Sequence, residues 1–365
     1  MSGDYTRLDD SPAFDFSWTS LPLRPPPLFG HDAFATGAAT VTLPLFTSGR
    51  ISSGIAAAYA RAQAADARVD ATSGDVRLAV AEAYVGVLRA RKALAVARSN
   101  VRTLESLERD TGSLFERELV PRNELLTAQV ALANARQEAL RAANAEVVAL
   151  ATYNRRLGAP LDRVAELDDV VEAPAGMPES VEALTEQALA RRAELAMLDA
   201  QAEAYGQMAK TERSRVLPQL VLTGRYQYLE NQFLDDEAVG MAGVGVQWAL
   251  FDGGQSRKRA AALERTRRAT AEQRADAESL VALQVRAAWL EWQEAKQRIG
   301  LTTHAAEQAE ESLRIAEERY AAGLGTQTQL LEAVTFRAQA WRNRDEAVLD
   351  ARLAQLRLAR AAGLL

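Results

Sequence analysis

The 365-residue sequence has no cysteine, few aromatic residues and no long apolar run. The absence of cysteine suits an oxidising compartment but also occurs in cytosolic proteins, so it leaves the localisation open. Because no window of about 18 apolar residues exists, we expect no transmembrane helix. The first ten residues also lack the apolar core of a secretory signal peptide.

The sequence also lacks the side-chain clusters that carry enzyme chemistry. The two histidines, His31 and His304, lie far apart and without a carboxylate cluster at ligand spacing. We therefore expect no metal site, no cofactor and no catalytic residue. The net charge of −6 comes from 43 basic and 49 acidic residues that are well mixed along the chain. Because no basic block is present, we also expect no nucleic-acid partner.

What the sequence does contain is an internal repeat. Residues 45–158 and 250–363 read as two copies of one unit, separated by a constant 205 residues. A register that holds without a gap over this length predicts a duplicated unit whose helices have fixed lengths. Matched pairs are Leu45 and Leu250, Leu119 and Leu324, and Gly158 and Gly363.

The composition and the apolar spacing predict long helices. Ala, Leu, Arg, Glu and Gln dominate, and apolar residues recur three and four positions apart. A helix of about 70 residues would be on the order of 100 Å long and would need neighbours, in coiled-coil-like packing. Thr326 is positioned to cap the last of these helices. The expected long helices cover residues 47–117, 121–157, 254–321 and 328–362.

Alternating segments precede each long helix and predict two β-hairpins. The second hairpin consists of QLVLTGRYQYL and VGMAGVGVQWALF, and the first of PAFDFSWTS and ATVTLPLF. Alternation over about ten residues, with aromatics toward the strand ends, is typical of membrane β-strands. The residues that we assign to the lipid-facing side are Phe14, Phe16, Trp18, Val41, Leu43, Leu45, Leu220, Leu222, Val244, Val246, Trp248 and Leu250.

The sequence thus predicts a mainly helical chain with a β-barrel portion, divided into five segments. Two strand hairpins cover residues 12–46 and 217–252, and two long helix pairs cover residues 47–158 and 253–363. Residues 159–216 lie between them, beginning with a Pro/Gly linker and continuing as a shorter helix pair at about 181–190 and 193–214.

Several segments resemble the TolC-like outer membrane efflux proteins. They are the strand-to-helix joins LPLFTSGR and WALFDGGQSRKR, the helix turns LVPRNELLTAQVALANA and RIAEERYAAGLGTQTQLLEA, and LPQL before a strand. The resemblance covers roughly residues 12–363 and implies a homotrimer. Each chain would supply four strands to a twelve-stranded barrel in outer-membrane lipid, and two long helix pairs to an α-barrel that extends into the periplasm. The implied function is an exit duct for efflux or type I secretion, docked to a periplasmic adaptor (membrane fusion) protein and an inner-membrane transporter.

The resemblance also implies roles for the turns between paired helices. We expect these turns to dock the adaptor, and ordinary helix–helix turns are the alternative. Acidic and amide side chains near the turns are candidates for a pore constriction, which would be an acidic ring in a trimer, whereas a solvated helix face is the alternative. The docking residues would be Leu119, Val120, Pro121, Gly323, Leu324, Gly325 and Thr326, and the constriction residues Glu124, Gln329 and Glu332.

The start of the chain departs from the family pattern, which has a signal peptide and a helix pair before the first strand. Neither has a counterpart here, so we expect a truncated N-terminus. The alternative function is a soluble, long coiled-coil scaffold, which the missing signal favours. The strands separate the two hypotheses, because a cytosolic scaffold has no use for apolar strand faces such as that of Val244 and Val246.

Overall fold

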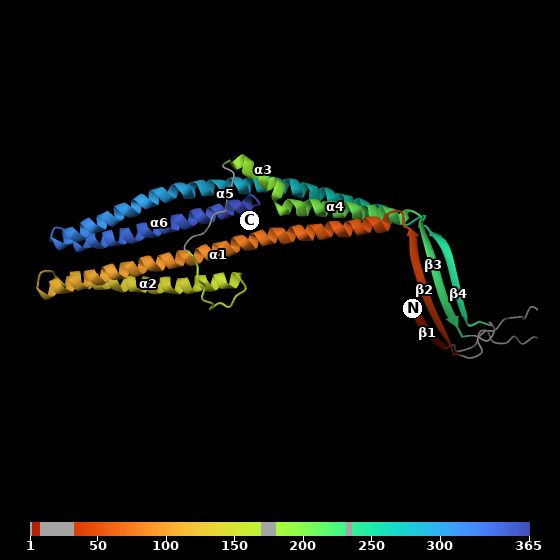
Figure 1. Cartoon of the computed structure of the whole chain (residues 1–365), viewed down its shortest axis with the longest axis horizontal. Coiled ribbons are helices and arrows are strands. Elements are labelled where there is room, and N and C mark those ends of the chain that lie inside the picture. The colour runs from red at the N-terminus through yellow and green to blue at the C-terminus, as the bar shows by residue number, and fades with distance from the viewer. Residues whose placement is uncertain (1, 8–32, 169–179, 231–235) are drawn as a thin grey trace, which may run out of the picture. The chain divides into compact units, whose positions relative to one another are not determined.

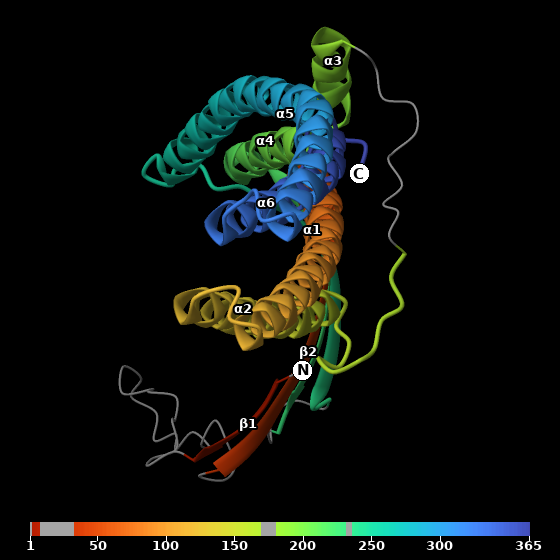
Figure 2. The same ribbon diagram turned by 90° about the vertical axis from the view of Figure 1, so that its left-hand side faces the viewer.

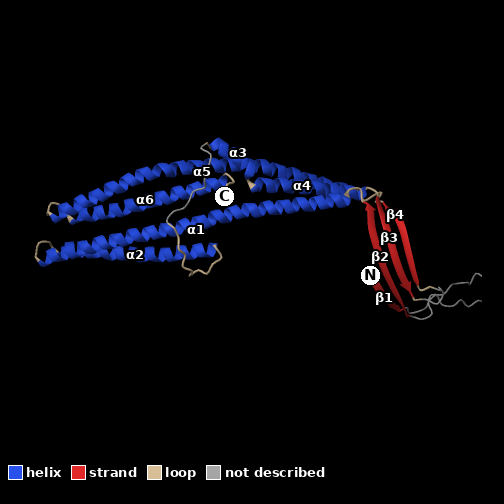
Figure 3. Cartoon of the chain, in the orientation of Figure 1, coloured by secondary structure: helices blue, strands red, loops and turns tan. Residues whose placement is uncertain are grey.

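The structure is a computed structural model that describes residues 2–7, 33–168, 180–230 and 236–365 (Figure 1). Helices make up most of it and one sheet the rest (Figure 3). None of the described helices combines the length and apolar character that crossing a membrane requires. In chain order the elements are β1 (Ser2–Arg7), β2 (Ala33–Phe46), α1 (Arg50–Glu116), α2 (Arg122–Arg156), α3 (Val181–Arg191), α4 (Ala193–Arg213), the 3-10 helix η1 (Ser214–Val216), β3 (Gln219–Leu229), β4 (Ala238–Gln247), α5 (Gln255–Ala321) and α6 (Gln327–Ala361).

The chain forms two compact units. Unit 1 comprises Met1–Gln63 and Asp199–Glu272 and contains the sheet. Unit 2 comprises Ala64–Leu198 and Gln273–Leu365 and contains the paired ends of the long helices. The prediction of a mainly helical chain that also contains a small antiparallel sheet is confirmed.

The helix lengths confirm the duplication. Helices α1 and α5 each have 67 residues, and α2 and α6 each have 35. Every bound in the second copy lies 205 residues after its counterpart. The entry turns match as well, since Gly49 (φ 83°) and Gly254 (φ 81°) both adopt the left-handed conformation that glycine favours. The two copies therefore share one local design for entering a long helix.

The sheet of unit 1 is antiparallel, in the order β1-β2-β3-β4. Strands β2, β3 and β4 fall where the alternation predicts them. Strand β1, at Ser2–Arg7, was not expected and pairs with the first half of β2. The predicted partner strand with Phe14, Phe16 and Trp18 lies outside the described residues.

Two details of the predicted strands are wrong. Trp248 and Leu250 are not strand residues, because β4 ends where Gln247 pairs with Gln219. The next partner would be Pro218, which has no N–H to continue the ladder. The indole of Trp248 instead donates to the carbonyl of Val216, at 3.0 Å.

The second correction concerns Leu45, which lies at a register shift in β2. Pro44 pairs with Val221, but the next pair joins Phe46 to Leu220. This irregularity takes Leu45 out of the strict alternation and gives Phe46 the place opposite Leu220.

The helices of unit 2 form a layer in the order α2-α1-α6-α5 (Figure 2). A hydrophobic cluster near the turns joins all four helices. Its buried members are Leu104, Leu107, Ala128, Leu132, Ala135, Leu313, Leu330, Ala333 and Val334. Because α1 and α6 have neighbours on both sides, α2 and α5 are the edges of the layer.

Ion pairs join α6 to both of its neighbours. Arg337 binds Glu310 of α5 at 2.7 Å and reaches Ser99 of α1 at 3.3 Å. Asp350 accepts from Arg89 of α1 and from Arg298 of α5. Arg357 binds Glu82 of α1 at 3.0 Å and Glu291 of α5 at 2.9 Å. Along α6 these charges alternate in sign, from Arg337 to Asp350 to Arg357. If α6 slid along its neighbours until Asp350 reached the partners of Arg337 or Arg357, carboxylates would face one another.

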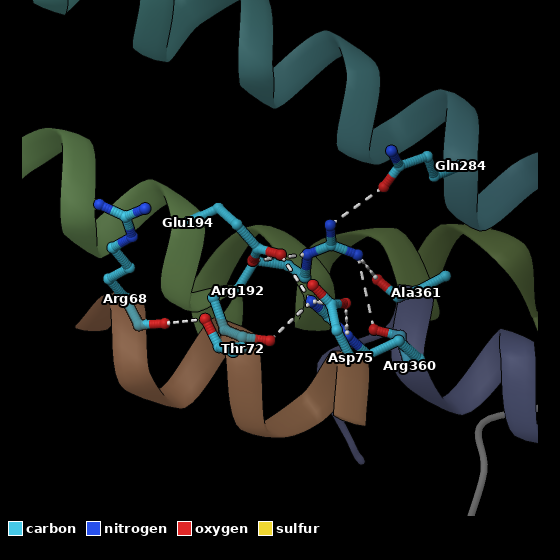
Figure 4. Close-up of polar contacts among 9 residues, drawn as sticks. Arg68, Thr72, Asp75, Arg192, Glu194, Gln284, Arg360 and Ala361 are labelled. Atoms are coloured by element: carbon cyan, nitrogen blue, oxygen red, sulfur yellow. Dashed lines mark hydrogen bonds and ion pairs between the residues drawn. The ribbon is translucent and has the colours of Figure 1, made fainter. Parts of the chain in front are cut away.

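A more buried polar junction ties the C-terminal end of α6 to α1, α4 and α5 (Figure 4). Arg192 donates to the carbonyls of Arg360 and Ala361, which end α6, and to Gln284 of α5. A guanidinium there also complements the negative end of the helix dipole. Both carbonyls are thus capped by a side chain from the α3–α4 turn.

The second arginine of this junction links α6 to two other helices. Arg360 binds Asp75 of α1 and Glu194 of α4, each at 2.7 Å, and only 11% of its side chain is exposed. Burial alone would raise the pKa of Glu194, but the hydrogen bond from Arg360 and the charge of Arg192 hold the pKa below its ordinary value. The carboxylate therefore stays ionised near neutral pH and keeps the junction paired.

We expect Arg360→Ala to destabilise unit 2 by about 3 kcal/mol or more, because it leaves Glu194 and Asp75 without their shared partner. The matched control is Arg155→Ala, at the exposed equivalent position of the first copy, which should change stability by less than about 0.5 kcal/mol. Thermal unfolding at a fixed protein concentration measures both. Equal melting temperatures for the two variants would contradict a structural role for the junction.

Candidate functional sites: the sheet faces and the helix-pair turns

One face of the sheet is apolar. Residues directly opposite each other in an antiparallel pair share a face, so the register identifies its members. Val41, Leu43, Leu220, Leu222, Val244 and Val246, which the sequence grouped together, all lie on this face. Arg7, at the end of β1, is its one charge among the described residues. The other members are Tyr5, Ala35, Gly37, Ala39, Gly224, Tyr226, Tyr228, Ala238, Gly240 and Ala242.

Aromatic side chains lie at both ends of this apolar band. Tyr226 and Tyr228 lie near the end of β3, opposite Ala39 and Gly37. Phe46 and Trp248 lie at the other end, beside the start of β3. Leucine, valine, glycine and alanine occupy the interval from Leu220 to Tyr226, which is about 20 Å along the strand at 3.3 Å per residue. Aromatic girdles around an apolar band are typical of strands that cross a membrane.

The opposite face is polar. Threonine, glutamine and glycine dominate it, with a few aliphatic residues and one arginine. Its members are Asp4, Thr6, Thr36, Ala38, Thr40, Thr42, Pro44, Gln219, Val221, Thr223, Arg225, Gln227, Leu229, Val239, Met241, Gly243, Gly245 and Gln247. The sheet is thus two-sided, although neither face is covered: Val41 on one side is 72% exposed and Arg225 on the other is also exposed.

The two helix-pair turns of unit 2 have the same backbone design. Leu119 donates to the carbonyl of Leu114 and Leu324 donates to that of Arg319, at 2.9 and 2.8 Å. Each turn places the preceding residue in the left-handed region, Glu118 at φ 56° and Gly323 at φ 71°. This is the Schellman ending of a helix, in which glycine is the preferred left-handed residue. Glu118 was missed by the sequence analysis, although its alignment with Gly323 is the signal that finds it.

The turns differ in how the next helix begins. Thr326 accepts from the amide of Gln329, and the Gln329 side chain accepts from the amide of Thr326, both at 3.3 Å. This reciprocal capping box confirms the predicted cap. Pro121 occupies the equivalent place in the first copy and forms no side-chain cap. Gln329, a predicted constriction residue, therefore has a capping role.

Apolar side chains project from both turns. Leu119 is 67% exposed and Leu324 is 73% exposed, whereas Val120 is half-buried. Beside them, a groove of about 560 Å³ runs between α1 and the α5–α6 pair. Leu107, Leu114, Tyr320 and other residues line it. The predicted docking residues thus lie near a concave surface whose lining mixes apolar with polar and charged side chains.

The predicted constriction residues have different surroundings. Glu124 is half-buried and accepts from the Tyr320 hydroxyl at 3.4 Å, and its carbonyl accepts from Gln327 at 2.9 Å. Burial, together with the Glu124 charge, raises the pKa of Tyr320, so the phenol remains a donor. Glu332 is exposed. Glu124 therefore joins the two turns within one chain, and Glu332 is the more accessible carboxylate.

Both edge helices of unit 2 carry exposed apolar residues that are separated by multiples of seven. On α2 these are Leu126, Leu140 and Val147, and on α5 they are Leu280, Leu301 and Ile315, with Ala287, Glu294 and Gln308 at the heptad positions between them. Residues separated by multiples of seven lie on one side of a helix, where a neighbouring helix can pack. Arg98, Arg102 and Arg136 surround Leu140, whereas Glu307 and Glu311 lie beside Ile315. Arg136 pairs with Glu105 of α1, and Glu311 pairs with Arg314 of its own helix, so each edge carries charges of both signs beside its apolar residues.

Within the described residues, no group of histidine, aspartate and glutamate side chains has the arrangement of a metal site.

Comparisons with known proteins identify the family. The family described as "Outer membrane efflux protein" matches residues 28–159 and 184–364. A curated relative, the alkaline protease secretion protein AprF of Pseudomonas aeruginosa, is 27% identical over 250 residues. The match covers 67% of this chain and 47% of AprF, so the chain spans about half the length of this relative.

Solved structures show the same fold at low sequence identity. The outer membrane protein VceC of Vibrio cholerae matches with a TM-score of 0.82 and 19% identity, over 99% of this chain and 85% of VceC. The CmeC outer membrane channel of Campylobacter jejuni matches with 0.77 and 14%, over 99% and 76%. The open state of the MtrE outer membrane channel of Neisseria gonorrhoeae matches with 0.74 and 19%, over 100% and 79%.

The shared left-handed position of the two turns predicts that substitutions there change the stability of unit 2 in opposite directions. We expect Glu118→Gly to stabilise unit 2 by about 0.5–1 kcal/mol, because glycine removes the left-handed strain of glutamate. Gly323→Ala should destabilise it by about 1 kcal/mol for the converse reason. Thermal unfolding of both variants checks this pair. Shifts of the same sign would show that the turns do not share the backbone design described above.

Proposed function

Because the chain belongs to the outer membrane efflux protein family, we propose that three copies form a continuous duct from the periplasm through the outer membrane. Each copy would contribute four strands to a twelve-stranded barrel and two long helix pairs to an α-barrel. The duct would be passive, with energy supplied by an inner-membrane transporter that acts through a periplasmic adaptor.

The observation that carries this proposal is the two-sided sheet with unpaired edges. In lipid, every backbone N–H and C=O needs a partner, so an open sheet cannot cross a membrane. Within the described residues, β1 and β4 each have a strand on one side only. Pairing β4 of one copy with β1 of the next would satisfy these groups and close a barrel. The apolar face would then contact lipid and the polar face would line water.

The edges of the helix layer support the same assembly. The α2 edge of one copy offers exposed leucine and valine and the α5 edge offers leucine and isoleucine, and both edges are flanked by charges of both signs. A contact between unlike surfaces forms a ring when the rotation between copies closes. Counted from the turns, Arg136 is the fifteenth residue of α2 and Glu307 the fifteenth of α5, which brings their charges to one level.

We assign adaptor docking to the turns. The exposed Leu119 and Leu324, near the groove, offer an apolar surface that solvent alone does not favour. The name of AprF concerns secretion of a protease, and that of the matched family concerns efflux. Both uses require a duct that couples to a partner across the periplasm. The rival function, a soluble scaffold, leaves the exposed valine and leucine face of the sheet without a role.

The trimer can be tested by disulfide crosslinking, since the chain has no cysteine of its own. Counted from the turns, Leu140 is the nineteenth residue of α2 and Leu301 the twenty-first of α5, so their heights above the turns differ by about 3 Å of helix rise. We expect Leu140→Cys combined with Leu301→Cys to give a covalent trimer on oxidation. Each single variant, and Leu301→Cys combined with Asn134→Cys on another face of α2, should give none. A dimer as the final product would contradict a threefold ring.

The lipid contact predicts unequal tolerance of arginine on neighbouring residues of β2. Val41→Arg should cost about 2–4 kcal/mol if it faces the bilayer midplane. Thr42→Arg, on the polar face, should assemble normally. Trimer yield in outer-membrane fractions measures both variants. Similar yields from the two would count against the barrel.

Docking at the turns predicts loss of transport without loss of assembly. Leu324→Asp should abolish efflux or secretion, because an unpaired carboxylate at an apolar contact costs several kcal/mol. Asp236→Asn, in the β3–β4 connection, is the control and should leave transport unchanged. Crosslinking to the adaptor and substrate accumulation are the measurements. Wild-type transport by a correctly assembled Leu324→Asp trimer would reduce this turn to an ordinary helix connection.

A further inference from the structure

Arg225 is the one charged residue in strands β2, β3 and β4, all of whose residues the structure describes. It lies on the polar face of β3, opposite Thr40 of β2 and Met241 of β4. Thr40 and Arg225 are near the middle of their strands. The charge is therefore placed about halfway along the sheet rather than at a rim.

No carboxylate neutralises this charge within the described part of the chain. The flanking residues on the same face of β3 are Thr223 and Gln227, and Arg225 forms no ion pair with any described residue. Asp4 of β1 pairs with Thr36 of β2, which in turn pairs with Leu229 of β3. Asp4 is therefore about 13 Å from Arg225 along the strand direction and two strands away across the sheet.

The other described acidic groups at that end of the sheet, Glu230, Asp236 and Glu237, lie at or beyond the end of β3, at least four residues or about 13 Å along the strand from Arg225. The Glu230 carboxylate accepts from the amide of Ala35 at 2.9 Å, and Glu237 accepts from the Tyr228 hydroxyl at 2.9 Å. The field of Arg225 is thus uncompensated along the middle of the polar face. Threonine and glutamine already make this face hydrophilic, so hydration alone does not require a charge.

We propose that in the assembled barrel three copies of Arg225 form a ring of positive charge in an otherwise neutral stretch of the lumen. This Arg225 ring makes the barrel favour anionic over cationic solutes, because rings of basic side chains attract anions in water-filled pores. The inference rests on the proposed trimeric barrel, and it gives that duct a preferred charge class of cargo.

A reporter cysteine beside Arg225 measures the local potential without depending on the state of the helix turns. Thr223→Cys lies on the same face, two residues or about 7 Å away, in a chain with no other cysteine. Assembled trimers in cells are treated from outside with two methanethiosulfonate reagents, one carrying a sulfonate and one a trimethylammonium group. The ratio of their reaction rates reports the preference for anions.

We expect adding Arg225→Gln to the Thr223→Cys reporter to lower the anion-to-cation rate ratio by about threefold at 0.1 M salt. Arg225→Lys should preserve the ratio, and Arg225→Glu should invert the preference. At 1 M salt the Debye length is about 3 Å, so the differences between variants should nearly vanish. The salt effect on the Thr223→Cys reporter alone tests the idea even if an Arg225 variant fails to assemble.

The outcomes separate this inference from the proposed function. Val41→Cys, on the apolar face, is the control and should react slowly with both reagents. If Thr223→Cys in an assembled trimer reacts with neither reagent, the polar face does not line water and the duct itself is wrong. If it reacts with both and the ratio is the same with Arg225→Gln and at either salt concentration, the duct stands and the Arg225 ring is overturned.

Discussion

Both units of this chain are open layers whose edges one copy cannot complete, and this constraint accounts for most of the remaining features. In the sheet, the unfinished edges are backbone donors and acceptors on β1 and β4, which lipid cannot satisfy. In the helix layer they are exposed apolar residues of α2 and α5, such as Leu140 and Leu301, which are in contact with water in one copy. The trimer proposed above would complete the edges of both layers.

The duplicated helix pairs differ where their places in the layer differ. Helix α6 lies between two helices and carries Arg337, Asp350 and Arg357, which bind partners on both sides. The equivalent residues of the edge helix α2 are Leu132, Ala145 and Thr152, which cannot form such pairs. The helix ends diverge in the same way. Arg192 caps the carbonyls at the end of α6, whereas Asn154, near the end of α2, donates to the carbonyls of Leu161 and Arg163 in the following loop.

Much of the fold follows from short-range patterns. Helix bounds, the capping role of Thr326 and the shared face of Val41, Leu43, Leu222 and Val244 depend on periodicity and local turn chemistry, which the sequence displays directly. Features that depend on a distant partner were not predictable in this way. The end of β4 before Trp248 depends on Pro218, thirty residues earlier, and the displacement of Leu45 depends on the register against β3. The pairing of Arg360 with Glu194 and Asp75 required the positions of three helices.

The distribution of charge gives each surface a distinct task. Ion pairs are concentrated between helices, where alternating signs fix the level of α6 against its neighbours, although exposed pairs of this kind contribute only about 0–1 kcal/mol each. Their contribution is therefore to register more than to stability, and the hydrophobic cluster near the turns supplies the stability. Strands β2 to β4, in contrast, contain a single charged residue, Arg225, on the face that would line water. Because Arg225 has no charged partner among the described residues, its field would act on passing solutes, so in the proposed barrel the middle of the sheet, rather than the helices with their ion pairs, would select solutes by charge.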